Sequence, residues 1–386
     1  MLGIASSSCY GSAPMAFNDL QADLEQLGDR ERRRVLAPRR GLDLASNDYL
    51  GLAGSDRLRH AVSDALGRGV AIGSGGSRLL RGNAPEHEAL EVEAARFFGA
   101  EAALFTGGGY AANAMLLSTL PQRGDLVIHD ELIHASAHEG MRLGRAERVA
   151  FAHNDVAAAA NAIARWRRDG GAGTPWIAVE SLYSMDGDQA PLAELAVLAE
   201  REGAMLLVDE AHATGVFGPD GRGLTAGLRD RANLVTLHTC GKALGCEGAL
   251  ILGPAVVRDF LINRGRAFIY STAPSPLMAE AVRNALAILH DEPERRSRLH
   301  ALIRHAEAEL APLGVRATRS PILPLIIGDD RRTMEIAGAL QARGFDVRGV
   351  RPPTVSPGTS RLRISITNNV DEAAISALAT ALRDLL

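Results

Sequence analysis

The sequence contains almost no lysine. Of its 42 lysine and arginine residues, 41 are arginine, and Lys242 is the single lysine among 386 residues. An arginine guanidinium stays protonated in proteins, whereas a desolvated lysine amine can lose its proton and become a nucleophile. One interpretation is that an arginine-biased composition left one surface lysine by chance. The other is that one site needs an amine that can be neutral.

The residues around Lys242 favour the second interpretation. A strand-like apolar run at 234–239 leads directly to Gly241 and Lys242, and further glycines follow at 245 and 248. An amine at the end of a buried strand, with glycines clearing space around it, is typical of a lysine that forms a Schiff base. We therefore predict a covalent cofactor site at Lys242.

Cysteine and long apolar runs are also scarce. Cys9, Cys240 and Cys246 are the only cysteines, which predicts no disulfide framework and fits a reducing cytoplasm. No apolar run approaches the length that spans a membrane. The first twenty residues carry no lysine or arginine, which argues against secretory and mitochondrial signals. Met15 is a second candidate start, with residues 1–14 as an extension.

Composition and length indicate a large globular enzyme. With 46% hydrophobic and 23% charged residues the chain is typical of folded proteins, and its length predicts two domains. The net charge of −4 gives no sign of a nucleic-acid or membrane surface. Arginine clusters at 32–34 and 167–168 are either anion sites or solvated faces.

Short apolar runs alternate with helix-like segments, which predicts an α/β fold whose strands are buried on both faces. The expected strands lie at 103–106, 126–129, 176–180, 205–208, 234–237 and 249–252. The expected helices between them lie at 111–120, 156–168 and 192–202.

The pattern changes near residue 275. A long helical stretch at 277–313, interrupted near 291–293, precedes a smaller unit. In that unit we expect strands at 322–327, 345–350 and 361–366, and a helix at 332–343. We therefore predict an N-terminal segment at 1–45, a large domain at 46–275 and a small C-terminal domain at 276–386.

A glycine turn follows the first expected strand. Gly107, Gly108 and Gly109 precede a helix, whose free amides and dipole suit a phosphate. A dinucleotide-binding fold or a plain tight turn has a similar pattern. Asp125 and Asp130 stand near the spacing of a ribose-binding acid, so this turn alone does not exclude NAD.

Acidic and imidazole groups follow two other strands. Asp209 ends an apolar run, and His212 lies three residues further on. A carboxylate there can hold a pyridinium nitrogen in its protonated form, although the same pair is also typical of a helix cap. His134 follows the 126–129 strand and is either a ring-stacking residue or an ordinary histidine.

Taken together, these motifs resemble those of the α-oxoamine synthases, which are fold-type I pyridoxal-phosphate enzymes. The resemblance covers roughly residues 40–370. Its supporting segments are 46–52 (SNDYLGL), 73–78 (GSGGSR), 151–155 (FAHND), 183–188 (YSMDGD), 209–215 (DEAHATG), 239–242 (TCGK), 351–355 (RPPTV) and 358–363 (GTSRLR). It implies a large domain with a mixed, mostly parallel sheet flanked by helices, and a smaller C-terminal α+β domain.

The resemblance implies roles for residues around pyridoxal 5'-phosphate. Lys242 would form the internal aldimine and move the Cα proton, and Asp209 would pair with the pyridine nitrogen. His134 would stack on the ring. The remaining cofactor contacts would be Ser184 and His212 at the phenolic oxygen, Gly109, Tyr110 and Thr239 at the phosphate, and Ser271 and Thr272 at the phosphate of a partner subunit. The last pair implies a homodimer.

The resemblance also implies the substrates. Asn47 and Arg361 would bind the amino-acid carboxylate, and Thr354 would contact substrate. The nearest match within the family condenses L-alanine with pimeloyl-CoA, or its carrier-protein thioester, and releases CoA and CO2. The arginine that would meet the far carboxylate of the acyl chain lies among residues 32–34. Ile133 departs from the family, which usually has a small polar residue there.

Three alternatives remain open. A glycine-using acetyltransferase or a long-chain acyl synthase would keep the same catalytic residues. A cofactor-binding protein without turnover would be expected to lack the combination of His134, His212 and Arg361. A nicotinamide-dependent oxidoreductase would leave Lys242 unexplained.

Overall fold

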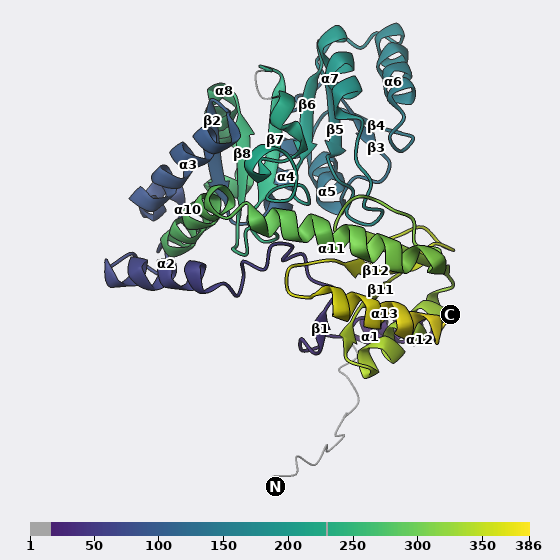
Figure 1. Ribbon diagram of the computed structural model, residues 1–386. Coiled ribbons are helices and arrows are strands. Elements are labelled where there is room, and N and C mark those ends of the chain that lie inside the picture. Colours follow the sequence, from purple (N-terminus) through teal and green to yellow (C-terminus); the bar gives the residue numbers. More distant parts are fainter. Residues whose placement is uncertain (1–16, 229–230) are drawn as a thin grey trace.

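The computed structural model describes residues 17–228 and 231–386, so Met15 and the residues before it lie outside the described residues (Figure 1). A seven-stranded sheet in the order β2-β8-β7-β6-β5-β3-β4 forms the centre of the larger part. In this sheet β8 runs in the opposite direction to the other six strands. Its strands are β2 (Ala102–Thr106), β3 (Leu126–Asp130), β4 (Glu147–Phe151), β5 (Pro175–Glu180), β6 (Met205–Asp209), β7 (Leu234–Thr239) and β8 (Ala249–Gly253).

Helices cover both faces of this sheet. Alternate residues of β3 show why: Val127 packs in a cluster with α4 and α5, whereas Leu126 and Ile128 pack with α6 and α7. A strand buried on both faces needs apolar side chains at every position. The helices of the larger part are α2 (Asp56–Gly67), α3 (Pro85–Phe98), α4 (Gly109–Thr119), α5 (Ala135–Leu143), α6 (Val156–Arg168), α7 (Leu192–Arg201), α8 (Ala255–Arg264) and α9 (Arg266–Ile269).

The smaller part is built on a three-stranded antiparallel sheet. Its strand order is β11-β12-β9, with β9 at Ile322–Gly328, β11 at Arg348–Val350 and β12 at Ser360–Ser365. A short parallel pair joins β1 (Leu42–Asp43) to β10 (Phe345–Asp346), so the N-terminal segment reaches this part. Its helices are α11 (Glu294–Leu310), α12 (Asp330–Ala342) and α13 (Glu372–Arg383), while α1 (Asn18–Asp29) precedes β1.

The expected fold class is confirmed, and each expected strand and helix overlaps an observed element. The expected interruption near 291–293 separates α10 (Pro276–Asp291) from α11. β4 was not expected, because four of its five residues are exposed at the sheet edge and form no apolar run. The division at 45/46 and 275/276 stays a prediction; α10 packs against α2 and α3 of the larger part.

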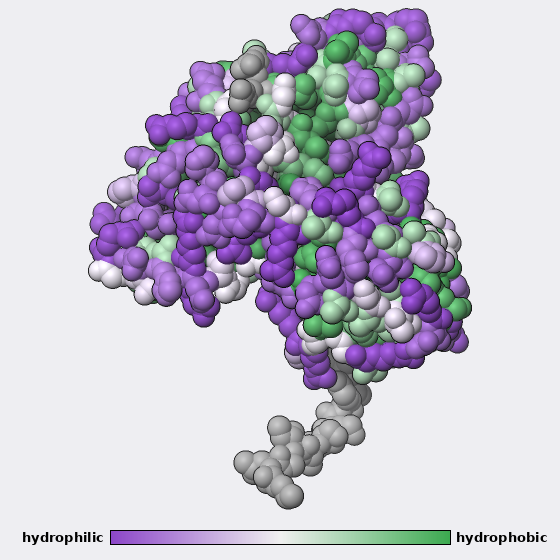
Figure 2. Space-filling view, viewed as in Figure 1, coloured by the Kyte–Doolittle hydropathy of each residue, from purple (hydrophilic) through white to green (hydrophobic). Residues whose placement is uncertain are grey.

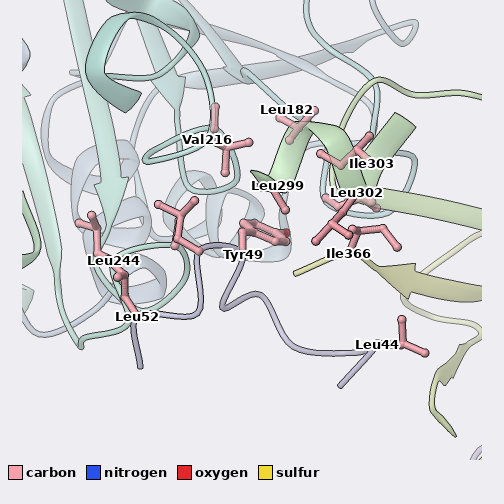
Figure 3. Packing of buried hydrophobic residues seen from close by; sticks show 14 of the residues in the cluster. Leu44, Tyr49, Leu52, Leu182, Val216, Leu244, Leu299, Leu302, Ile303 and Ile366 are labelled. Carbon is pink, nitrogen blue, oxygen red and sulfur yellow. The ribbon is translucent and has the colours of Figure 1, made fainter. Parts of the chain in front are cut away.

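One apolar cluster joins the two parts. Figure 3 shows Tyr49 beside Leu299 of α11, and Leu44 and Ile366 lie further along the same cluster. All four side chains are fully buried. The segment that carries Asn47 is therefore packed between the two parts rather than lying on the surface.

The outer surface is mostly hydrophilic, with hydrophobic residues visible over the strands in the upper middle of the view (Figure 2). A pocket of about 570 Å³ lies where β6 and β7 begin and β8 ends, lined in part by Met205, Leu234 and Leu252. Within residues 17–228 and 231–386, no helix is both long and apolar enough to cross a bilayer.

Because the shared cluster is fully buried, shortening one of its side chains on α11 should cost much of the protein's stability. Leu299→Ala should lower the free energy of unfolding by about 2–5 kcal/mol, because it leaves a cavity among fully buried neighbours. Val197→Ala, on the exposed side of α7, should change it by less than about 0.5 kcal/mol. Urea unfolding of both variants measures the difference, and equal costs would contradict this packing.

Candidate active site

The candidate site lies along one edge of the large sheet. His134 follows β3, Glu180 ends β5, Asp209 ends β6 and Lys242 follows β7. These four strands are parallel, so their carboxyl ends meet at the same edge, where open α/β sheets bind ligands. The structure therefore brings together side chains that are more than a hundred residues apart in sequence.

The amine of Lys242 lies in a partly buried position. Its Nζ is 2.8 Å from Nε2 of His212. Burial lowers the pKa of Lys242 to about 8, although the carboxylates of Asp209 and Glu180 oppose this shift and Arg363 adds to it. Roughly a tenth of the amine is therefore neutral at pH 7, far more than for an exposed lysine, and the neutral form is the one that attacks carbonyl carbon.

His212 continues a hydrogen-bond chain away from Lys242. Burial, together with the charges of Lys242 and Arg363, holds the pKa of His212 well below its usual value. Because an ammonium group only donates, Nε2 of this neutral ring accepts from Lys242 and its Nδ1–H donates to Tyr49 Oη, 2.7 Å away. Tyr49 in turn donates to Oδ1 of Asn47 over 3.0 Å. A continuous series of hydrogen bonds thus connects Lys242 to Asn47.

Asp209 is held by two donors. Asn113 Nδ2 donates to Oδ2 over 2.6 Å, and the amide of Ala211 donates to Oδ1 over 2.9 Å. The same Asn113 amide donates to the hydroxyl of Ser136, which lies 2.7 Å from Nδ1 of His134. This network fixes the orientation of the Asp209 carboxylate relative to the His134 ring.

Glu180 is the register partner of Asp209 on the neighbouring strand. Burial and the charge of Asp209 raise the pKa of Glu180 well above its usual range. Its Oε2 accepts from the amide of Ser184 over 3.2 Å, whereas its Oε1 has no hydrogen-bond partner among the described residues. Glu180 therefore binds its proton more tightly than an exposed glutamate does.

The glycine turn at 107–109 leads into α4, close to the end of β7. α4 begins at Gly109, and Gly108 before it supplies no side-chain cap. A Cβ at Gly109 would lie 3.5 Å from Oγ1 of Thr239, so the turn approaches the end of β7 closely. The ring of exposed Tyr110 meets His134 edge-on at 6.5 Å. Free amides, a hydroxyl and a helix N-terminus together suit a phosphate.

Two arginines of β12 reach the site from the smaller part. Arg363 donates to Oδ1 of Asn47 over 3.1 Å and to the carbonyl of Ser184 over 2.7 Å. Arg361, two residues earlier on the same face, pairs with Asp186 at 2.6 Å. The expected carboxylate-binding arginine is therefore engaged by an acidic side chain, and its neighbour contacts Asn47.

The other predicted residues lie further out. Thr354 accepts from Arg34 over 3.4 Å, at the junction with the N-terminal segment. Ser271 and Thr272 are exposed, and no hydrogen bond between described residues joins them to Lys242 or Asp209. Residues 32–34 line the same junction, where Arg32 pairs with Asp330 at 2.9 Å.

Sequence reasoning missed four residues of this site. Each had only a weak signal in the sequence. Tyr49 is an aromatic residue close to Asn47, and Asn113 is an amide in the helix after the glycine turn. Glu180 is a second carboxylate at a strand end, and Arg363 is a second arginine on one strand face.

The model of the aminotransferase class I and II family matches residues 39–382. The chain belongs to this family. A curated 8-amino-7-oxononanoate synthase of Anaeromyxobacter dehalogenans (strain 2CP-1 / ATCC BAA-258) is 44% identical and covers 96% of this chain and 97% of its own length. One from Chromobacterium violaceum is 41% identical, covering 94% and 97%. The family predicted from the motifs is confirmed.

Solved structures agree with this assignment. Serine palmitoyltransferase from S. paucimobilis with a bound PLP–myriocin aldimine has a TM-score of 0.86 and 28% identity, covering 96% of this chain and 97% of its own. An 8-amino-7-oxononanoate synthase from Francisella tularensis has a TM-score of 0.73 and 26% identity, covering 89% and 96%. The fold-type I architecture expected from the sequence is confirmed.

The environment of Lys242 predicts an unusual titration. In the cofactor-free protein, acetylation of Lys242 should show a midpoint near pH 8. Asp209→Asn should move that midpoint lower, because it removes a carboxylate that stabilises the ammonium form. Peptide mapping by mass spectrometry separates this lysine from the N-terminal amine. A midpoint typical of an exposed lysine would contradict the buried setting.

Proposed function

We propose that this protein is a pyridoxal-phosphate-dependent acyltransferase of biotin biosynthesis. It condenses L-alanine with pimeloyl-CoA, or with the carrier-protein thioester, to give 8-amino-7-oxononanoate. A carbon–carbon bond forms between Cα of alanine and the thioester carbonyl, the thioester C–S bond breaks to release CoA, and the carboxylate leaves as CO2. The observation that carries the proposal is the desolvated amine of Lys242, set beside His212 and Asp209 at the sheet edge. Relatives at 41–45% identity that bear this enzyme's name support it.

The donor set of the site fits pyridoxal phosphate. Lys242 would be the attachment point for its aldehyde, and the amides of Gly109 and Tyr110 with the hydroxyl of Thr239, which lie close together, would hold its phosphate. Asp209, oriented by its two donors, would hold the proton on the pyridine nitrogen. When bound, the cofactor supplies an electron sink for the bonds that break at Cα.

Three further side chains orient the ring and the proton transfer. His134 would lie against one face of the ring, and Ser184 and His212 would contact its phenolic oxygen. The neutral His212 ring holds Nζ of Lys242 in place by the 2.8 Å hydrogen bond. Because the pKa of Lys242 is about 8, the amine can both accept the Cα proton and return it near neutral pH.

The carboxylate of the amino acid binds at Asn47. Arg361 stays a predicted contact, but its pairing with Asp186 leaves Arg363 as the guanidinium that lies against Asn47. We therefore assign the main carboxylate contact to Arg363. At the other end, the hydrogen bond between Arg34 and Thr354 favours Arg34 for the far carboxylate of the acyl chain.

The active form is a homodimer in the cytoplasm. Ser271 and Thr272 are exposed in the single chain, as expected if they meet the phosphate bound in a partner subunit. Neighbouring Tyr270 is 72% exposed, which suits burial in such an interface. Cys240 and Cys246 are free, as in a reducing compartment.

The substrates are tested by CoA-thiol release with pyridoxal phosphate and pimeloyl-CoA, adding L-alanine, glycine or L-serine in turn. We expect release only with L-alanine, and a product with the mass of 8-amino-7-oxononanoate. Release with glycine, or only after the acyl chain is changed, would move the enzyme to another branch of the family. Those branches are the glycine C-acetyltransferases and the long-chain acyl-CoA condensing enzymes.

Two variants test the roles of Lys242 and Asp209. Lys242→Arg keeps a positive charge but cannot become neutral, so it should fold and lose turnover by at least about a hundredfold. Asp209→Asn should retain pyridoxal phosphate better than it retains activity, because a neutral amide no longer holds the pyridinium proton. Asp259→Asn, which alters an exposed ion pair with Arg258, is the control and should leave kcat unchanged. Wild-type turnover in either site variant contradicts its assigned role.

A further inference from the structure

His153 bridges two carboxylates next to the site. It follows β4, in the FAHND segment, and has no place in the chemistry described above. Its Nδ1 lies 2.9 Å from Oδ1 of Asp130, and its Nε2 lies 2.7 Å from Oδ2 of Asp188. Both ring nitrogens therefore face acceptors, which only an imidazolium can satisfy at the same time.

The first carboxylate shapes the turn that presents His134. Asp130 ends β3, and its side chain is fully buried. Besides the contact with His153, it accepts from the amides of Leu132 over 2.9 Å and Asn154 over 2.8 Å. Leu132 lies in the short turn that ends at His134, the N-cap residue of α5. Movement of Asp130 would therefore move His134.

The second carboxylate belongs to the turn that presents Ser184. The amide of Tyr183 donates to the carbonyl of Asp188 over 2.9 Å, so residues 183–188 form a closed turn. The side chain of Asn154 adds a 2.9 Å hydrogen bond to Asp188. His153 and Asn154 together therefore hold one end of this turn.

The opposite side of the turn is held by the smaller part of the protein. Arg363 donates to the carbonyl of Ser184, and Arg361 pairs with Asp186. Because these two contacts fix the middle of the turn, the His153 contact sets the position of its end. The turn that carries Ser184 is thus clamped between β12 and His153.

The charges around His153 favour its protonated form. The titratable groups that face it are Asp130 at the end of β3 and Glu131 after it, and Tyr183 and Asp188 after β5; on its own segment, Asp155 caps α6. Burial by itself would lower the pKa of His153, but the hydrogen bonds and charges of Asp130 and Asp188 outweigh it and raise the pKa to about 10. The ring therefore stays charged across the neutral range.

We propose that His153 is a positioning residue, which as an imidazolium ties the turn presenting His134 to the turn presenting Ser184. The distance between these two side chains then depends on the two N–H groups that the imidazolium donates, one to Asp130 and one to Asp188. This inference rests on the proposed function, because it takes His134 and Ser184 as cofactor contacts.

Removing the charge should introduce a new pH dependence. In His153→Gln, Asp130 and Asp188 face each other without a cation, so burial and mutual repulsion raise the pKa of one of them. The variant then loses affinity for pyridoxal phosphate as pH rises through that pKa and both carboxylates ionise. Wild type should not, because its imidazolium titrates only near pH 10.

The test measures the dissociation constant of pyridoxal phosphate for the full chain by its visible absorbance. We expect His153→Gln to bind about tenfold more weakly than wild type at about pH 8.5, and to recover most of that loss at about pH 6. The double variant His153→Gln/Asp188→Asn is the matched control. It removes the repulsion, so its affinity relative to that of wild type should change little with pH.

A double-mutant cycle with Ser184 separates positioning from general destabilisation. If His153 acts through Ser184, His153→Gln should cost less in a Ser184→Ala background than in wild type. Equal costs in both backgrounds, or a His153→Gln affinity that follows wild type at every pH, would overturn the inference. A wild-type chain that does not bind pyridoxal phosphate would instead overturn the proposed function.

Discussion

The rest of the site depends on one constraint, which is that an ionisable amine lies at the carboxyl edge of a buried sheet. Burial weakens the ammonium form of Lys242, and the carboxylates of Asp209 and Glu180 partly restore it, so that the pKa falls only to about 8. Without those carboxylates the pKa of Lys242 would be lower still, whereas an exposed lysine stays charged at neutral pH. This intermediate balance allows one side chain to be a nucleophile, a base and an acid in turn.

Hydrogen bonds connect Lys242 to residues of both parts of the protein. Through His212 and Tyr49, Lys242 is connected to Asn47, which also accepts from Arg363 of the small sheet. The apolar cluster around Tyr49 and α11 holds these groups in register (Figure 3). The place proposed for a substrate carboxylate is consequently built from both parts, and the group proposed for proton transfer comes from the larger one.

Much of the fold could be predicted because doubly buried strands are continuous apolar runs, such as β3 and β6. The edge strand β4 could not, because its exposed residues form no such run, and the reversed direction of β8 leaves no mark in hydrophobicity. Lys242 and Asp209 stood out by residue type at strand ends. Arg363 did not, because its role follows from a contact with Asn47, 316 residues away in the sequence. Contacts of that kind are set by packing between the parts and not by local pattern.

The most direct test of the central claim is borohydride reduction of the protein loaded with pyridoxal phosphate, followed by peptide mapping by mass spectrometry. Because Lys242 is the only lysine, the chain offers just one other amine, at its N-terminus. The account predicts a phosphopyridoxyl group on Lys242 alone, in an amount that matches the bound cofactor. A label confined to the N-terminal amine, or none despite bound cofactor, would contradict it.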